Sequence, residues 1–161
     1  MTRSRLIALA GTLLLTIACA QEDPRAAVVR VSADDARMNA AIVKARTTVE
    51  AFEAALRSPK QSQSHFSVNV RISDADGVEH FWTSDVRYDG AVFHARIDND
   101  PEVVKSVKLG QAVTVRPQDI SDWMYVDHGV LVGGYTLRVI RDAMTPAERA
   151  ELDKSLPFKI Q

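Results

Sequence analysis

The chain has 161 residues, of which 46% are hydrophobic, 25% charged and 6% aromatic. This composition is typical of one globular domain and excludes collagen-like, coiled-coil and wholly disordered chains. Lys and Arg number 20 against 21 Asp and Glu, a formal net charge of -1, so no basic excess indicates nucleic acid as a partner. One cysteine and four histidines argue against an internal disulfide and a structural zinc site, and we expect neither metal nor cofactor.

Residues 1–18 have the features of a bacterial signal peptide. Arg3 and Arg5 form a short basic start, and the stretch 6–17 that follows carries no charge. This apolar run is shorter than the roughly 20 residues that a membrane-spanning helix needs, but it suits the core of a secretory signal. We therefore exclude these residues from the predicted fold.

Residues 15–19 (Leu-Thr-Ile-Ala-Cys) resemble a bacterial lipobox, whose cysteine becomes the acylated first residue, although Thr16 stands where leucine is usual. Cys19 is the only cysteine and follows the apolar run directly, which favours its lipidation. Several acyl chains on one residue give stable anchoring. In enterobacterial lipoproteins, an aspartate directly after the acylated cysteine favours retention in the inner membrane. Ala20 stands at this position instead, and this points to the periplasmic face of the outer membrane. The alternative is cleavage after Ala20 and a soluble periplasmic protein.

Residues 20–31 are predicted to be a tether, and a single folded domain is predicted to span residues 32–161. Ser32 and Asp35 form a variant of the capping box that starts helices. The apolar residues that follow are three or four positions apart. This spacing predicts one long N-terminal helix that ends at Ser58-Pro59 and packs its apolar stripe on a sheet. The stripe consists of Met38, Ile42, Ala45, Val49, Phe52 and Leu56.

The period then changes to two, which predicts a half-buried strand at 65–72. A turn at 74–77 leads to a second strand at 78–88, and Asp89-Gly90 predicts a tight hairpin into a third strand at 91–97. We therefore expect Trp82 to lie in the core, because the residues paired across that turn would share one face. The expected pairs are Trp82 with Ile97, Val86 with Phe93 and Tyr88 with Ala91.

The second half of the chain is expected to contain four further elements. Asp100 and Pro101 predict a short middle helix that Gly110 closes. A short strand at 112–116 follows, and then a hairpin of residues 123–126 and 130–140. A capping box at 145–148 opens a C-terminal helix that runs to about residue 156. The fold class is therefore α+β, a mainly antiparallel sheet of about 5–6 strands with a long N-terminal helix, a short middle helix and a C-terminal helix.

Four motifs occur in a fixed order between residues 79 and 140. They are 79–82 (Glu-His-Phe-Trp), 99–101 (Asn-Asp-Pro), 120–125 (Ile-Ser-Asp-Trp-Met-Tyr) and 133–138 (Gly-Gly-Tyr-Thr-Leu-Arg). In order and spacing this series resembles the YegJ-like family of bacterial proteins, a domain of unknown function, over about residues 64–142. Two of the motifs are also distantly similar to immunity proteins of bacterial toxin systems. The resemblance implies no established activity and no catalytic residue.

Few side chains of this sequence suit catalysis. The only set suited to acid–base chemistry or metal binding consists of Glu79, His80, Asp119 and Asp122. One alternative function is therefore a small periplasmic, hydrolase-like enzyme that uses Glu79, His80 and Asp122. The simpler expectation is that His80 is a hydrogen-bonded, part-buried histidine. Asp119 and Asp122 would then cap backbone amides in a turn.

The hairpin of residues 123–140 is expected to bring carboxylates, an arginine and aromatic rings to one edge of the sheet, because its two strands run antiparallel. Gly133 and Gly134 are expected inside this hairpin, not between a strand and a helix, as a bulge or a place where a ring approaches closely. The feature is either an internal salt bridge with ring-on-glycine packing or a recognition site. Its members are Asp119, Asp122, Trp123, Tyr125, Tyr135 and Arg138.

The sequence therefore favours an uncharacterised cell-envelope lipoprotein that acts as a non-enzymatic binding module for a protein or another envelope component. An immunity-like protein that neutralises a toxin is a further alternative. The expected contact with the membrane is through the lipid on Cys19. The candidate binding or structural residues are Glu79, His80, Trp82, Asp119, Asp122, Trp123, Tyr125, Gly133, Gly134, Tyr135 and Arg138.

Overall fold

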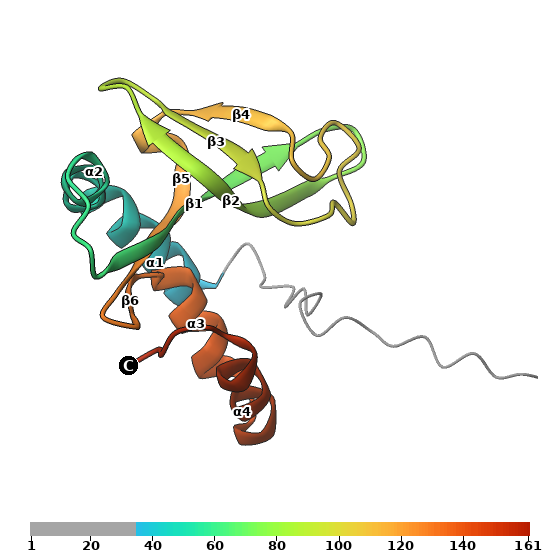
Figure 1. Cartoon of the computed structure of the whole chain (residues 1–161). Helices are drawn as coiled ribbons and strands as arrows, with labels where there is room; N and C mark the ends of the chain where they lie inside the picture. The colour runs from blue at the N-terminus through green and yellow to red at the C-terminus, as the bar shows by residue number, and fades with distance from the viewer. Residues whose placement is uncertain (1–34) are drawn as a thin grey trace, which may run out of the picture.

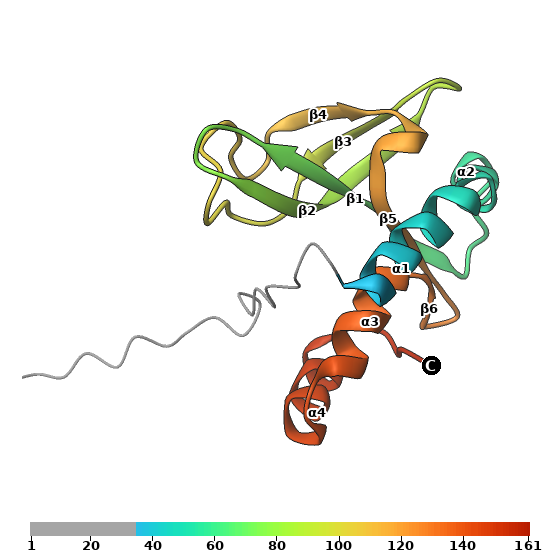
Figure 2. The same cartoon turned by 180° about the vertical axis from the view of Figure 1, so that it is seen from behind.

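The computed structural model describes residues 35–161, so the predicted signal peptide, Cys19, the tether and Ser32 lie outside the described residues. Within this range six strands form one antiparallel sheet in the order β4-β3-β2-β1-β5-β6, which confirms the α+β class (Figures 1 and 2). The strands are β1 (Gln63–Ser73), β2 (Val78–Tyr88), β3 (Phe93–Ile97), β4 (Ala112–Val115), β5 (Ile120–Asp127) and β6 (Val130–Gly133). The helices are α1 (Ala36–Thr47), α2 (Val49–Arg57), α3 (Tyr135–Ala143), α4 (Pro146–Ser155) and the short 3-10 turn η2 (Pro117–Asp119).

The predicted long N-terminal helix is two helices, because the chain breaks at Thr48. Its backbone leaves the helical region (φ -116°, ψ 8°), and its hydroxyl donates to the carbonyl of Lys44 at 2.7 Å. α1 begins after Asp35, whose carboxylate accepts the N–H groups of Arg37 and Met38, so Asp35 is itself the N-cap. The predicted stripe is buried at its centre, at Ala45, Val49 and Phe52.

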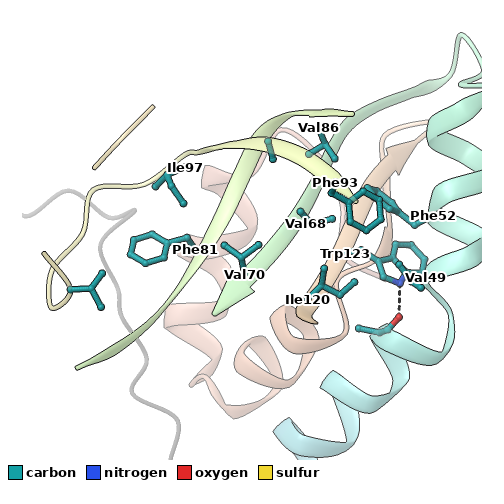
Figure 3. Packing of buried hydrophobic residues seen from close by; sticks show 13 residues of the cluster. Val49, Phe52, Val68, Val70, Phe81, Val86, Phe93, Ile97, Ile120 and Trp123 are labelled. Carbon is teal, nitrogen blue, oxygen red and sulfur yellow. Dashed lines mark hydrogen bonds between the residues drawn. The ribbon is translucent and has the colours of Figure 1, made fainter. Parts of the chain in front are cut away.

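Phe52 stands at the centre of the core, between α2 and the sheet (Figure 3). Its ring centroid lies 5.9 Å from that of Phe66, 5.7 Å from that of Phe93 and 5.5 Å from that of Trp123. The Trp123 indole N–H donates to the carbonyl of Ala45 at 2.9 Å, which satisfies the polar atom of a buried ring. Rings from β1, β3 and β5 therefore converge on one side chain of α2.

The hairpin between β2 and β3 has a longer loop than the predicted two-residue turn. Tyr88 lies opposite Phe93, so residues 89–92 form the loop. The Asp89 carboxylate accepts the N–H groups of Ala91 and Val92, both at 2.9 Å, and this holds the wider turn. The predicted register is therefore wrong at all three of its pairs.

A bulge in β2 also changes which residues face the core. Asp85 has φ +53°, and the register with β3 shifts at this point. Before the bulge Phe81 and Thr83 are buried, and after it Val86 is buried. Trp82 lies on the opposite face of the strand and is partly exposed, so its predicted place in the core is wrong.

The predicted short middle helix is absent, and residues 98–111 form a loop that a carboxylate holds. Glu79 of β2 is buried and accepts the N–H groups of Glu102, Val103 and Val104 at 3.0–3.3 Å. In a helix starting at Asp100 the first amides would lack partners. A side chain from the neighbouring strand binds them instead, and the loop is fixed without a helical turn.

A second carboxylate, that of Asp74 in the β1–β2 turn, binds the same loop. Its Oδ2 accepts the N–H groups of Lys105 at 2.7 Å and Ser106 at 2.9 Å, and its Oδ1 accepts that of Asp76 at 2.9 Å. The N–H of Lys105, followed by those of Asp76 and Ser106, lowers the pKa of Asp74 to about 2. Because this folded-state pKa lies below the ordinary value of about 3.9, the stabilisation is complete above about pH 4 and is lost as the pH falls towards 2.

We expect Asp74→Asn to loosen the loop at neutral pH, since one amide oxygen cannot serve both the turn and the loop. Hydrogen exchange at residues 105–106, measured at about pH 6 and pH 2.5 and corrected for intrinsic rates, checks this. The wild-type loop should lose a large part of its protection at the lower pH, whereas the variant should lack it at both. Asp89→Asn is the matched control, because Asp89 also has a pKa of about 2 but holds the other hairpin. Equal protection in the wild type and Asp74→Asn would contradict the assignment.

The predicted strand at 130–140 ends at Gly133, where the chain turns into α3. Gly134 is the N-cap of this helix in the left-handed conformation (φ +62°), so the two glycines do lie between a strand and a helix. α4 starts at the predicted capping box, in which the side chains of Thr145 and Glu148 each accept the N–H of the other residue. A second small core covers the other face of β5 and β6, with Val126, Leu131 and Phe158 at its centre.

Candidate functional site

The turn at Gly133 and Gly134 is the most tightly packed part of the predicted edge feature. Gly133 has φ +74°, and a Cβ atom there would lie 2.3 Å from the Trp123 carbonyl oxygen and 2.5 Å from its ring. The prediction that a glycine leaves room for a ring is therefore confirmed. Tyr135 packs edge-on against Trp123, with ring centroids 5.6 Å apart, and its hydroxyl oxygen lies 3.2 Å from that of Thr48.

The two aromatic residues of β5 face the main core. Trp123 is buried, and Tyr125 is partly buried with its ring stacked on Phe66 at 5.1 Å. Met124 and Val126 point the other way, into the second core. The aromatic pair therefore holds the fold together and does not line an open groove.

Asp122 is fully buried at the start of α3. Its Oδ2 accepts the N–H and the hydroxyl of Thr136 at 2.7 and 2.6 Å, and its Oδ1 accepts the N–H of Trp123 at 2.8 Å. Desolvation raises the pKa of Asp122, and these hydrogen bonds oppose the rise. Because Gly134 has no side chain to cap α3, Asp122 performs the capping role from the neighbouring strand.

Arg138 does not pair with either predicted aspartate. Its guanidinium donates to the backbone carbonyls of Gly133 at 3.0 Å and Leu131 at 2.9 Å, and also to that of Gln161. Asp119 instead forms an exposed ion pair with Arg116 at 2.5 Å. Apart from Asp119, the residues predicted to form the edge feature do lie together. Their contacts favour internal packing over a recognition site, and the predicted salt bridge is absent from these contacts.

Glu79, His80 and Asp122 do not assemble into an acid–base site. Glu79 and His80 are neighbours on a strand and point to opposite faces, with Glu79 buried against the loop at 102–104. Asp122 lies two strands away from β2, sealed at the start of α3. Within residues 35–161 no group of three or more His, Cys, Asp and Glu side chains is placed to hold a metal ion.

Trp82 and His80 share the face of the sheet that points away from Phe52, which we call the outer face. Across the β1–β2 pair His80 lies opposite Arg71, and Trp82 lies opposite Asn69. His80 and Arg71 are exposed, and Trp82 is partly exposed. Partial desolvation lowers the pKa of His80, and the positive charge of Arg71 lowers it further, so the imidazole is neutral near pH 7. His80 is therefore exposed on this face but partly desolvated, and the prediction of a part-buried histidine stays a prediction.

The outer face carries further cations on β2 and β3. Arg87 and Arg96 are exposed, and Arg96 contacts the Asp85 carboxylate at 3.5 Å. No salt bridge involves Arg71 or Arg87 within the described part of the chain. Sequence reasoning missed Arg71, although the turn at 74–77 places it opposite His80. An aromatic ring among exposed arginines is typical of binding surfaces.

A groove of about 440 Å³ opens between β1 and β4. Residues 70–72 line it on β1, and residues 113–116 and Asp119 line it on the other side. Val113 and Val115 are partly buried and pack against the edge of the main core, so they give the groove an apolar part beside its polar lining residues. The sequence predicted β4 but gave no sign of this groove, because the groove depends on how the sheet curls.

Residues 35–160 match the family model described as an uncharacterized protein conserved in bacteria (DUF2314), and the chain belongs to this family. The chain is 35% identical over 123 residues to the uncharacterized protein YegJ of Escherichia coli (strain K12), covering 76% of this chain and 79% of that protein. The predicted YegJ-like resemblance is thus confirmed, and the family match is wider than residues 64–142.

A second relative is a putative ankyrin repeat protein of Neisseria meningitidis serogroup B (strain ATCC BAA-335 / MC58). It is 39% identical over 80 residues, which are 50% of this chain but 32% of that longer protein. No solved structure matches the chain. Among residues 35–161, no helix has both the length and the apolar character needed to cross a bilayer.

Proposed function

We propose that this bacterial protein is a cell-envelope lipoprotein, anchored at the periplasmic face of the outer membrane through Cys19, whose domain binds another protein through the outer face. Trp82 carries the proposal. A tryptophan that the core does not use stays partly exposed beside His80 and Arg71. Tryptophan and arginine supply much of the binding energy in protein interfaces.

Two further observations support binding over hydrolysis and anchoring over free diffusion. Glu79 and Asp122, the carboxylates of the alternative enzyme, are each occupied by backbone N–H groups and lie two strands apart in the sheet. Cys19, the only cysteine, follows the apolar run of the signal sequence directly. Acylation of that residue would supply the two or more chains that stable anchoring needs.

Photo-cross-linking in the bacterium that encodes the protein tests both parts. A photoreactive phenylalanine derivative at His80 should give a discrete protein adduct, whereas the same probe at exposed Glu151 of α4 should not. Adding Trp82→Ala should reduce the His80 adduct by about tenfold or more, the effect of losing an interface hot spot. In the same cells, Cys19→Ser should move the protein from the detergent phase to the aqueous phase.

Each part can fail separately. Equal adducts at His80 and Glu151, or adducts unaffected by Trp82→Ala, would overturn the binding role. A wild-type protein that partitions into the aqueous phase, with Gln21 as its unmodified first residue, would overturn the anchor. Lys154→Ala, a change at another exposed residue of α4, is the matched control for Trp82→Ala and should leave the adduct unchanged.

A further inference from the structure

The sheet has two unpaired strand edges that face each other across the groove. β4 is the last strand of the sheet and pairs only with β3 among the described residues. β1 pairs with β5 up to Val70 opposite Ile120, so residues 71–73 pair with β2 alone. Four residues, 116–119, carry the chain from β4 into β5 (Figure 2), and Arg116 and Asp119 are among those that line the groove.

The hydrogen-bond pattern shows which groups of β4 are free. Ile97 donates its backbone N–H to the carbonyl of Gln111 at 3.0 Å, and Asp98 donates to Trp82 on the other side of β3 at 3.0 Å. Hydrogen-bonded and non-hydrogen-bonded pairs alternate along an antiparallel ladder. His94 opposite Thr114 is therefore a non-bonded pair, and the N–H and C=O of Thr114 point away from β3.

The side chains around this edge define what fits there. Val70, Ile72, Val113 and Val115 supply apolar surface to the groove. The Arg116 cation is already paired with Asp119 at 2.5 Å, which leaves Arg71 as the unneutralised charge at the rim. An occupant with alternating apolar residues and at least one carboxylate would complement both features.

We propose that the groove between β1 and β4 binds an extended segment of another polypeptide, which adds to the free edge of β4 as a further antiparallel or parallel strand. Its apolar residues alternate along the segment and enter the groove, and an acidic residue pairs with Arg71. Backbone hydrogen bonds to Thr114 supply affinity, and the groove and Arg71 supply selectivity, as in other cases of strand addition. This proposal extends the binding role of the outer face: it shares Arg71 with that face and otherwise uses a different part of the sheet.

Hydrogen exchange of the full-length protein in detergent tests the proposal. The probe is a synthetic peptide of about nine residues, a typical strand length, in which valine alternates with glutamate. It should slow exchange at residues 112–116, while a scrambled peptide of equal composition should not. A peptide that alternates valine with lysine should bind about tenfold more weakly, the effect of about 1.4 kcal/mol from the charge of Arg71.

Substitutions at two positions make the outcome specific. Thr114→Pro removes the outward N–H at an edge position that tolerates proline, and it should abolish protection by the peptide, whereas Thr114→Ser should retain it. Arg71→Glu, at an exposed residue, should reverse the preference between the acidic and the basic peptide. Protection that is absent in the wild type, or that survives Thr114→Pro, would overturn the proposal.

The same proteins separate this proposal from the proposed function. If the peptide protects β4 but no adducts form at His80, the proposed strand-binding groove is supported and the binding role of the outer face is overturned. Adducts at His80 without protection of β4 would do the opposite. Trp82→Ala should not change peptide protection at 112–116, because Trp82 does not line the groove.

Discussion

Replacing Gly133 by alanine is expected to cost the protein about 3 kcal/mol or more of its stability, because two separate penalties add. A non-glycine residue held at φ +74° is strained by about 1–3 kcal/mol. The new Cβ would also lie 2.3 Å from the backbone carbonyl oxygen of Trp123, which cannot move without shifting β5. Overpacking of this kind costs about 1–3 kcal/mol more. Domains of this size have only about 5–15 kcal/mol in total.

Gly129→Ala is the control that separates the two penalties. Gly129 has φ +76°, almost the same as Gly133, but nothing lies within 4 Å of the position of its Cβ. The difference between the two variants in urea unfolding therefore measures the contact with Trp123 alone. Truncating the ring with Trp123→Leu should not rescue Gly133→Ala, since the nearest atom belongs to the backbone. Equal destabilisation at both glycines would show that the close approach to Trp123 does not matter.

Local patterns predicted most of the elements of the fold correctly. The alternation at 65–72 and the range 78–88 correspond to β1 and β2, and the capping box at 145–148 starts α4. Each of these signals depends on residues only a few positions apart. The α+β class follows from them, because strands between helices have few other ways to bury their apolar faces.

The errors arise where a distant side chain replaces a local signal. Asp100 and Pro101 carry the signals of a helix start, but Glu79 binds the amides at 102–104 and holds them as a loop. Asp122 likewise caps α3 from the neighbouring strand, so no capping residue precedes that helix in the sequence. A reading of local propensity cannot detect partners more than 10 residues away.

Single backbone irregularities account for the misplaced candidate residues. The bulge at Asp85 changes the parity of β2, which sends Trp82 outward and brings Phe81 and Val86 inward. Asp85 is a residue type that tolerates positive φ, yet nothing in its neighbours marks that conformation. The candidate site could therefore be predicted as a list of residues, but not as a surface.

Phe81→Ala and Trp82→Ala test this change of parity at two adjacent positions. Phe81 is fully buried, and removing its ring should cost about 3–5 kcal/mol. Trp82 is partly exposed on the outer face, so its truncation should cost about 1 kcal/mol or less, in spite of the larger ring. The sequence alone predicted that Trp82 lies in the core, and therefore that Trp82→Ala causes a large loss of stability. Chemical unfolding of both variants, with Phe81→Leu as a conservative control, measures the two free energies directly.

The two variants should also separate stability from binding. Phe81→Ala should lose cross-linking at His80 only to the extent that the domain unfolds, and a stabilising solute such as sucrose should restore it. Trp82→Ala should lose cross-linking in a protein that remains folded, and no stabiliser should restore it. A large loss of stability in Trp82→Ala would return this residue to the core and would remove the observation on which the binding role of the outer face depends. A folded Trp82→Ala protein that has lost its partner would instead assign the exposed ring to recognition.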